Sequence, residues 1–223
     1  MIRRVRLRIA GVHAERIYKH LYPGDGNEAV AFALCGRHRH GDVEVLLVQE
    51  VIPVPYADCD VREPDRVTWR TDAIELVLQQ AARQKLGVVK FHSHPGGYDR
   101  FSRTDDESDR DLFPSVYGWV DDDGPHASVV LLPDGRYFGR SIDVDNAFHS
   151  LEQVLVVGHD IGVFAETPTK SLPEHARRCT RRSESGPLAG LKVGHPNAKP
   201  RASMGDAPDG SGHSYSSCRS RTR

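Results

Sequence analysis

Long apolar runs are missing from this chain of 223 residues. No stretch approaches the roughly 20 consecutive apolar residues with which a helix crosses a bilayer, so we expect no membrane span. The N-terminal residues 1–8 are basic and lack the continuous apolar core of a signal peptide. Val5 and Leu7 alternate there with charged residues, which is typical of a half-buried strand. We therefore expect a cytoplasmic protein.

Cysteine and net charge are also scarce. The four cysteines lie far apart, and none belongs to a Cys-x-x-Cys pair. This spacing argues against a disulfide framework and against a thiolate zinc site, and it fits a reducing compartment. The formal net charge is only −1, so the chain as a whole carries no signal for nucleic acid or for a membrane surface.

Hydrophobic residues make up only 38% of the sequence, and few of them lie near its C-terminal end. From about Glu166 onward the chain is rich in Arg, Ser, Pro and Gly and almost free of aromatic residues. Such a segment buries too little apolar surface to offset the entropy lost on ordering. We predict a folded domain over residues 1–160 and a disordered basic tail over residues 166–223. A solvated tail is the favoured interpretation, and a contact with nucleic acid is the weaker alternative.

The most informative stretch begins at His92-Ser93-His94-Pro95. It follows the apolar residues 87–91, which predict a buried strand. Residues two apart on a strand point to the same face, so we expect the two imidazoles to lie side by side. Pro95 lacks a backbone N–H and should end the strand.

Ser102 and Asp105 form the second half of this stretch. A serine followed at the third position by a carboxylate resembles a capping box, which starts a helix. Side chains of a first helical turn lean toward the N-terminus, which aims Asp105 back at the strand end. Two imidazoles and one carboxylate suit a tetrahedral Zn²⁺ that keeps one position for water. Each half alone has an ordinary explanation, as surface histidines or as a helix cap, but together they predict a catalytic zinc site.

The spacing H-x-H-x7-S-x2-D resembles the JAMM motif of the MPN-type zinc isopeptidases, also called the JAB or Mov34 family, in its bacterial form. The fixed positions are all present, and the resemblance runs from the N-terminus to about residue 140–160. It implies one zinc per chain bound by His92, His94 and Asp105, with Glu28 as general base and acid. It also implies that the Ser102 hydroxyl donates to the oxyanion of the tetrahedral intermediate. The implied fold is a single α/β domain, in which a curved mixed sheet is flanked by helices and holds zinc at a sheet edge.

The residues alone leave two choices open. Glu28 precedes the buried apolar run 29–36, and the family places its glutamate before such a run; other upstream carboxylates are found at Glu15, Glu44, Glu50, Glu63 and Glu75. Asp106 neighbours Asp105, but one step along a helix turns a side chain by about 100°, so only one of them can face a metal. The family spacing selects Asp105.

The remaining pattern predicts the other elements of the fold. We expect strands at 5–9, 29–36, 43–48, 67–69, 115–120, 127–132, 136–140 and 154–157. We expect one helix at 11–21, with Ile17, Tyr18 and Leu21 on one face, and another at 73–86, ended by Gly87. A polar turn at 37–42, which holds the rival pair His38 and His40, and a long loop at 52–66 complete the prediction.

The motif itself predicts metal-assisted hydrolysis, whereas the substrate follows from the resemblance alone. The resemblance implies a zinc metalloprotease that hydrolyses the amide at the C-terminus of a ubiquitin-like protein, with the segments 52–66 and 96–101 as walls of the substrate channel. One alternative is the same chemistry on a sulfur-carrier protein or another small peptide amide. Another is a non-catalytic MPN scaffold. An E1-like adenylating enzyme is a further expected partner, and no G-x-G-x-x-G follows that would mark such a domain in this sequence.

Overall fold

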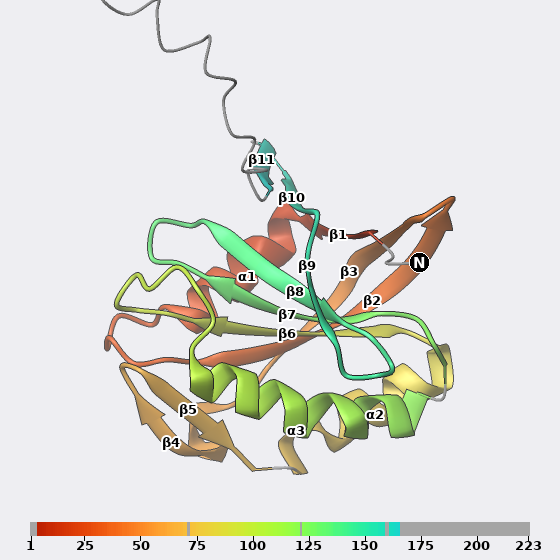
Figure 1. Cartoon of the computed structure of the whole chain (residues 1–223). Coiled ribbons are helices and arrows are strands. Elements are labelled where there is room, and N and C mark those ends of the chain that lie inside the picture. Colours follow the sequence, from red (N-terminus) through yellow and green to blue (C-terminus); the bar gives the residue numbers. More distant parts are fainter. Residues whose placement is uncertain (1–3, 71, 121, 159–160, 166–223) are drawn as a thin grey trace, which may run out of the picture. The chain divides into compact units, whose positions relative to one another are not determined.

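The computed structural model describes residues 4–70, 72–120, 122–158 and 161–165. Its main feature is a nine-stranded mixed sheet in the order β11-β10-β1-β3-β2-β6-β7-β8-β9, and a second sheet pairs β4 with β5 (Figure 1). The elements in chain order are β1 Arg4–Ala10, α1 Gly11–Leu21, β2 Val30–His40, β3 Val43–Pro53, the 3-10 helix η1 Tyr56–Asp58, β4 Cys59–Glu63, β5 Arg66–Trp69, α2 Asp72–Gln84, β6 Gly87–Ser93, α3 Arg103–Val120, β7 His126–Leu131, β8 Tyr137–Ile142, β9 Phe148–Ser150, β10 Gln153–Val157 and β11 Ile161–Phe164.

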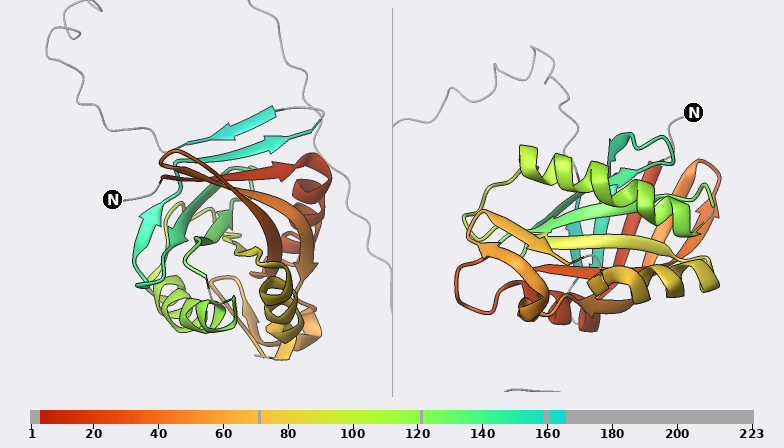
Figure 2. Two further views of the ribbon diagram at one scale, coloured as in Figure 1. Left: turned by 90° about the vertical axis from the view of Figure 1, so that its right-hand side faces the viewer. Right: turned by 90° about the horizontal axis from the view of Figure 1, so that it is seen from below.

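The large sheet carries an apolar core on each face. Along β2, Ala31 and Ala33 belong to the core that includes α1, whereas Phe32 and Leu34 belong to the core that includes α2 and α3. This alternation follows from the two-residue period of a strand. Figure 2 shows the sheet strongly curled, with α2 and α3 side by side along it. The predicted curved mixed sheet flanked by helices is confirmed.

The first helix covers one face of this sheet. Its residues Ile17 and Leu21 are fully buried, four positions apart, as a helical period of 3.6 residues requires. Tyr18 is 42% exposed, so its predicted place on the buried face is wrong. The third helix covers the other face and is longer than predicted. Residues 115–120 are its last turns, not a strand, because Val116 and Val120 continue its buried helical stripe.

The segment 52–66 is not the predicted long loop. β3 continues to Pro53, and β4 forms an antiparallel hairpin with β5. The predicted strand at 67–69 is the second half of that hairpin. Sequence periodicity missed β4 because its residues are exposed or half-buried and therefore mostly polar. Its Arg62 stacks over the Tyr56 ring and pairs with Asp25, so polar contacts hold the hairpin.

Two further boundaries differ from the prediction. β2 runs to His40, so the predicted turn at 37–42 shrinks to Gly41 and Asp42, and Gly41 takes a positive φ of 60°. α2 ends at Gln84, and the residue that leaves it with a positive φ is Lys85. Gly87 instead begins β6, where a Cβ would lie 2.8 Å from Leu46 Cδ2. A larger residue there would displace the buried Leu46 side chain, so Gly87 permits close packing and does not end the helix.

The strand that carries the motif lies inside the sheet. β6 pairs antiparallel with β2 and parallel with β7, and all seven of its residues are buried. His92 and Ser93 lie at its carboxyl end. The predicted placement of a metal at a sheet edge is therefore not confirmed, since the histidines mark the end of an interior strand.

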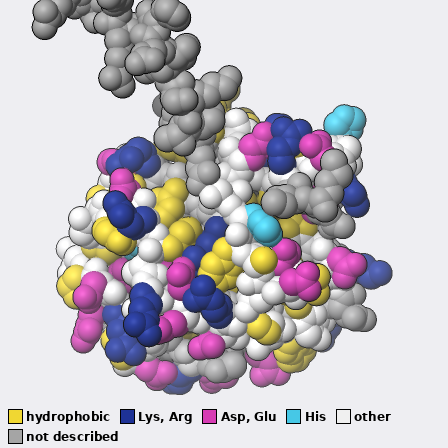
Figure 3. Space-filling model, in the orientation of Figure 1, with side chains coloured by type: hydrophobic (Ala, Val, Ile, Leu, Met, Phe, Trp, Pro, Cys, Tyr) yellow, Lys and Arg dark blue, Asp and Glu magenta, His cyan; other side chains and the backbone are white. Residues whose placement is uncertain are grey.

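The C-terminal part of the described chain is a strand pair. β10, predicted at 154–157, runs parallel to β1, and β11 pairs with β10. The predicted tail at 166–223 lies outside the described residues. None of the helices in the part that the structure describes is long and apolar enough to span a bilayer. On the face seen in Figure 3, acidic and basic side chains are interspersed.

Candidate metal centre

The carboxyl end of β6 brings the two histidines together. His92 and His94 are both buried and lie on the same side of the chain, as the two-residue spacing predicts. The chain turns immediately afterwards, where the Gly97 N–H donates to the His94 carbonyl at 2.9 Å. Gly97 takes a positive φ of 74°, a conformation that glycine adopts without strain.

The predicted capping box at the start of α3 is confirmed. The Asp105 N–H donates to Ser102 Oγ at 3.1 Å, and the Ser102 N–H donates back to Asp105 Oδ2 at 2.7 Å. The Ser102 hydroxyl also donates to Asp105 Oδ2 at 2.7 Å. The Asp105 side chain is thereby held pointing back from the helix toward the end of β6.

Three potential ligand atoms converge at this point. His92 Nε2 and His94 Nε2 are 3.1 Å apart, and they lie 2.9 Å and 3.3 Å from the Asp105 carboxylate oxygens. Zinc bonds to nitrogen and oxygen of about 2.0–2.1 Å at tetrahedral angles would separate the ligand atoms by about 3.3 Å. Within the described residues, this is the group of His, Cys, Asp and Glu side chains that could hold a metal ion. Its donor atoms and their spacing fit zinc.

The electrostatics of this group favour a bound cation. Burial would raise the pKa of Asp105, but hydrogen bonds from His92 and His94 hold it well below its ordinary value. Burial also opposes charge on His94, yet Asp105 and the Tyr98 carbonyl raise the pKa of His94. At His92 burial dominates and lowers the pKa. The carboxylate therefore stays ionised among buried groups and attracts positive charge, whether a proton or a metal ion.

Neighbouring groups orient the imidazoles. His94 Nδ1 lies 2.6 Å from the Tyr98 carbonyl, so Nδ1 donates to that carbonyl and Nε2 is the ring nitrogen directed at Asp105. His92 Nδ1 is buried without a hydrogen-bond partner among the described atoms. The ring centre of Phe101 lies 6.3 Å from that of His92, and Phe138 lies 6.1 Å from His94. These rings limit the positions that the two imidazoles can take.

Glu28 is brought to the same place by the pairing of β2 with β6. The Ala29 N–H donates to Ser93 Oγ at 3.0 Å, and the Ser93 N–H donates to the Ala29 carbonyl at 3.2 Å. Glu28 is buried and lines a cavity of about 20 Å³ together with His92 and Asp105. Burial raises the pKa of Glu28 to about 8.

The rival carboxylates lie elsewhere. Glu15 pairs with Lys19, Glu50 accepts a hydrogen bond from Gln80, and Glu75 accepts one from Gln79. None of these, nor Glu44, lines the cavity that Glu28 shares with His92, and Glu63 reaches Glu28 through its backbone carbonyl. Asp106 pairs with Arg140 and so turns away from the histidines. The rival histidines His38 and His40 lie on the outer end of β2.

The sequence reasoning missed one group beside the site. Lys90 lies on β6, two residues before His92, and is only 2% exposed. It forms an ion pair with the fully buried Asp109, which also binds Arg140 of β8. A lysine inside the apolar run 87–91 was the available signal, because a buried ammonium requires a partner.

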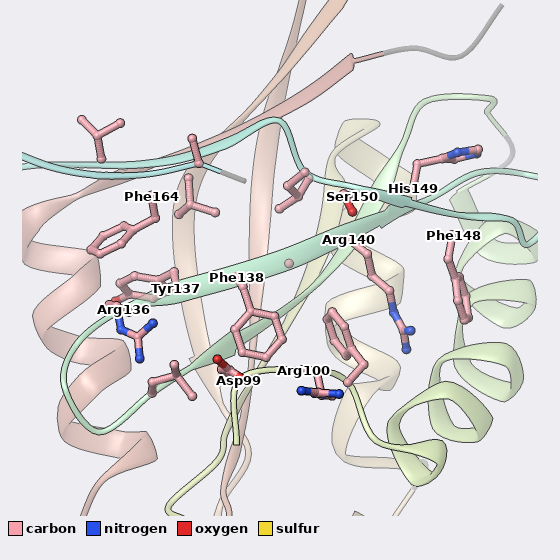
Figure 4. Close-up of a pocket in the computed structure, with 17 residues that line it drawn as sticks. Asp99, Arg100, Arg136, Tyr137, Phe138, Arg140, Phe148, His149, Ser150 and Phe164 are labelled. Atoms are coloured by element: carbon pink, nitrogen blue, oxygen red, sulfur yellow. The ribbon is translucent and has the colours of Figure 1, made fainter. Parts of the chain in front are cut away.

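Two larger hollows flank the site. A groove of about 520 Å³ between β5, α2 and α3 is lined by both tryptophans of the chain, Trp69 and Trp119. It shares five lining residues with the small cavity at Glu28: Arg66, Val67, Trp69, Thr104 and Ser108. The second hollow, of about 630 Å³, lies along β8, from which Phe138 and Arg140 project on the same side (Figure 4).

Three comparisons with known proteins bear on this chain, and one of them shows its family. The solution structure of protein DSY2949 from Desulfitobacterium hafniense is similar to this chain at 16% identity and a TM-score of 0.44, over 69% of this chain and 94% of that one. No curated protein matches. A family model described as prokaryotic homologs of the JAB domain matches residues 12–138, a range that includes all five predicted site residues. The chain belongs to this family of prokaryotic JAB-domain proteins.

Proposed function

We propose that this protein is a zinc-dependent metallopeptidase of the JAMM type that hydrolyses an amide at the C-terminus of a ubiquitin-like protein. The observation that carries the proposal is the convergence of His92 Nε2, His94 Nε2 and the Asp105 carboxylate at distances of 2.9–3.3 Å. Three protein ligands leave one tetrahedral position free, as in catalytic zinc sites. Zinc bound there would supply Lewis acidity and lower the pKa of a coordinated water.

Glu28 is the proposed proton carrier. Its carboxyl group faces the same small cavity as His92 and Asp105, and none of the metal-ligand distances involves it. Without metal, burial raises the pKa of Glu28 to about 8, and the positive charge of a bound zinc would oppose this shift and favour the carboxylate, which is the form that accepts a proton. In the proposed reaction Glu28 accepts the proton of the attacking water and donates it to the leaving amine. Both transfers need only one positioned carboxylate.

Ser102 has two proposed roles. It caps α3 and holds the Asp105 carboxylate by two hydrogen bonds, which orients a ligating oxygen. Its hydroxyl is also the proposed donor to the oxyanion that forms at the scissile carbonyl. The hydroxyl has one proton, and in this structure it is directed at Asp105. The second role therefore requires that proton to turn toward the substrate.

The groove between β5, α2 and α3 is the proposed place of the substrate segment next to the scissile bond. It adjoins the metal-side cavity, with which it shares Trp69, Thr104 and Ser108 as lining residues. β5 pairs only with β4 among the described strands, so its other edge offers main-chain groups to an extended peptide. A ubiquitin-like C-terminus is such an extended segment. In this proposal the expected wall at 52–66 contributes through the hairpin β4–β5 instead of a loop, and the expected wall at 96–101 stays a prediction.

Two alternatives remain distinct from this proposal. The first keeps the metal chemistry and changes the substrate to a sulfur-carrier protein or another small peptide amide. The second is a scaffold without catalysis, and the presence of Glu28, His92, His94 and Asp105 together argues against it. An E1-like adenylating enzyme is the expected partner in either enzymatic case. Localisation in the cytoplasm is part of the same proposal.

The test uses linear fusions in which a reporter follows the terminal Gly-Gly of a ubiquitin-like protein or of a sulfur-carrier protein. The full chain loaded with zinc should cut after the last glycine, and a chelator should abolish the cut. Glu28→Gln purified in parallel controls for contaminating proteases. Cleavage of the sulfur-carrier fusion alone would favour the first alternative. A zinc-loaded protein that cuts neither fusion would overturn the proposed substrate class.

A further inference from the structure

A network of four charged side chains, three of them buried, lies beside the candidate metal centre. Lys90 of β6, Asp109 of α3 and Arg140 of β8 are each at most 7% exposed. Asp109 Oδ1 pairs with Lys90, and Asp109 Oδ2 accepts hydrogen bonds from Arg140 Nε at 3.0 Å and Nη2 at 2.6 Å. Arg140 Nη1 pairs in addition with Asp106. Two cations thus face two carboxylates.

The Lys90–Asp109 pair joins the same strand and helix that carry the candidate ligands His92 and Asp105. Lys90 precedes His92 by two residues on β6, and Asp109 follows Asp105 by four residues on α3. Two residues span about 6.6 Å along a strand, and four residues span about 6 Å along a helix. The Lys90–Asp109 contact therefore repeats the His92–Asp105 contact one step further along the same boundary between β6 and α3. Any sliding of the helix along the strand would break both contacts.

Arg140 holds the same part of α3 from a second strand. Its guanidinium carbon lies 3.9 Å from the ring centres of Phe101 and of Phe148. Figure 4 shows Arg140 reaching from β8 toward the helix, next to Phe148. Phe101 immediately precedes the capping residue Ser102. The chain that enters α3 and the first two turns of that helix are thus tied to both β6 and β8.

We infer that Lys90, Asp109 and Arg140 are positioning residues for the metal, which fix Asp105 at ligand distance from His92 and His94. The inference rests on the metal site of the proposed function. A buried ion pair is poor evidence for stability alone, because two apolar side chains of similar size often serve as well. What an apolar contact lacks is direction, whereas an ion pair fixes the register of helix and strand. Metal ligands need a fixed register, because a ligand atom displaced by about 1 Å no longer binds the metal well.

The decisive variant is the double change Lys90→Met and Asp109→Leu. It removes one charge of each sign and leaves the charge of Arg140 paired with Asp106, while Arg140 Nε and Nη2 lose their acceptor on Asp109. We expect a folded protein whose zinc affinity is about 10–100-fold weaker than that of the wild type, as for the loss of other groups that orient ligands. Affinity is measured by competition with a chelator, independently of turnover, and folding by circular dichroism.

A matched control lies at the other end of the sheet. Arg37 of β2 and Asp122 form a partly buried pair near the start of β7. The double change Arg37→Met and Asp122→Leu should lower thermal stability and leave zinc affinity unchanged. A drop in zinc affinity equal to that of the Lys90/Asp109 variant would show that any lost pair loosens the site, and would overturn the inference.

A second variant covers the case in which the double change does not fold. Asp109→Glu keeps every charge and adds one methylene between α3 and Lys90. It should also weaken zinc binding, because the helix is pushed along or away from β6. If this variant, or the folded double variant, binds zinc as tightly as the wild type, the inference is wrong and the proposed function stands. A wild type that binds no zinc would overturn both.

Discussion

Buried histidines occupy both ends of the parallel pair β6–β7, and their surroundings differ. His92 lies at the carboxyl end of β6 opposite Val130, whereas His126 starts β7 four residues earlier, about 13 Å away along the strand. His126 Nδ1 accepts the Val88 N–H at 2.9 Å, and its Nε2 lies 3.1 Å from Arg37 Nη2. Both of its nitrogens thus have neighbours within hydrogen-bonding distance.

The ring of His92 is equally buried but differently directed. Its Nε2 faces two other potential ligand atoms, at 3.1 Å and 2.9 Å. Burial lowers the pKa of both histidines, to about 3 for His126. Burial and pKa therefore do not separate a structural histidine from a candidate ligand. The groups that the ring nitrogens face do separate the two histidines. His126 faces an arginine and a backbone N–H, whereas His92 faces a histidine and a carboxylate.

The largest effect should come from removing one ligand at the metal end. His94→Ala should reduce bound zinc from about one per chain to a trace, because two ligands rarely retain zinc against a chelator. Hydrolysis should fall below detection. Elemental analysis of the purified chain measures the metal directly.

The structural histidine supplies the contrast. His126→Asn keeps an acceptor near the Val88 N–H and should retain zinc while losing stability. If His126→Asn lost zinc and His94→Ala kept it, the assignment of the two ends would be reversed.

The next effect separates the proton carrier from the ligands. Glu28→Gln keeps the shape of the side chain but cannot accept a proton, so turnover should fall by roughly 10²–10⁴-fold while zinc stays bound. Glu50→Gln, an exposed glutamate on β3, is the matched control and should leave both unchanged. Loss of zinc in Glu28→Gln would make this carboxylate a ligand, which the three-ligand arrangement does not allow.

The candidate metal site could be predicted from sequence because many of its contacts join residues close together in the chain. His92 and His94 are two residues apart on one strand, and Ser102 and Asp105 close a capping box within one turn. Such short-range geometry follows from backbone periodicity alone. Glu28 is different, since its place depends on the pairing of β2 with β6. Its position before a buried apolar strand favoured it among six carboxylates, and the choice rested mostly on the family resemblance.

The structural features missed from sequence are those set by tertiary contacts. The Lys90–Asp109–Arg140 network joins three elements, and no local pattern connects its members. The exposed hairpin β4–β5 has too few buried residues to show the alternation of a strand. The end of α3 contains Val116, Tyr117 and Val120, residues that favour strands, yet packing on the sheet holds them in a helix.

The smallest predicted effect is a change in stability with pH, of opposite sign at the two ends of the sheet. In metal-free protein the pKa of Glu28 is raised to about 8, so the folded state holds this proton more tightly than the unfolded state. Its stabilising effect is complete below pH of about 4.5 and is lost as the pH rises to about 8. The pKa of His126 is lowered to about 3, so its stabilising effect is present above about 6.5 and is lost as the pH falls.

Non-titrating variants make the two effects visible. The difference in Tm between wild type and Glu28→Gln should decrease as the pH rises from about 5 to 8, because only the wild type must give up a buried proton. The difference in Tm between wild type and His126→Asn should instead increase from about pH 4 to 6.5. In this range the unfolded wild type loses the proton on His126 that stabilises it in acid, and the variant has no such proton to lose. Differential scanning calorimetry in chelator resolves shifts of a few degrees, and Glu75→Gln, at an exposed position of α2, is the control. If the Tm of each variant changed with pH in parallel with the Tm of the wild type, neither Glu28 nor His126 would have the shifted pKa that its surroundings imply.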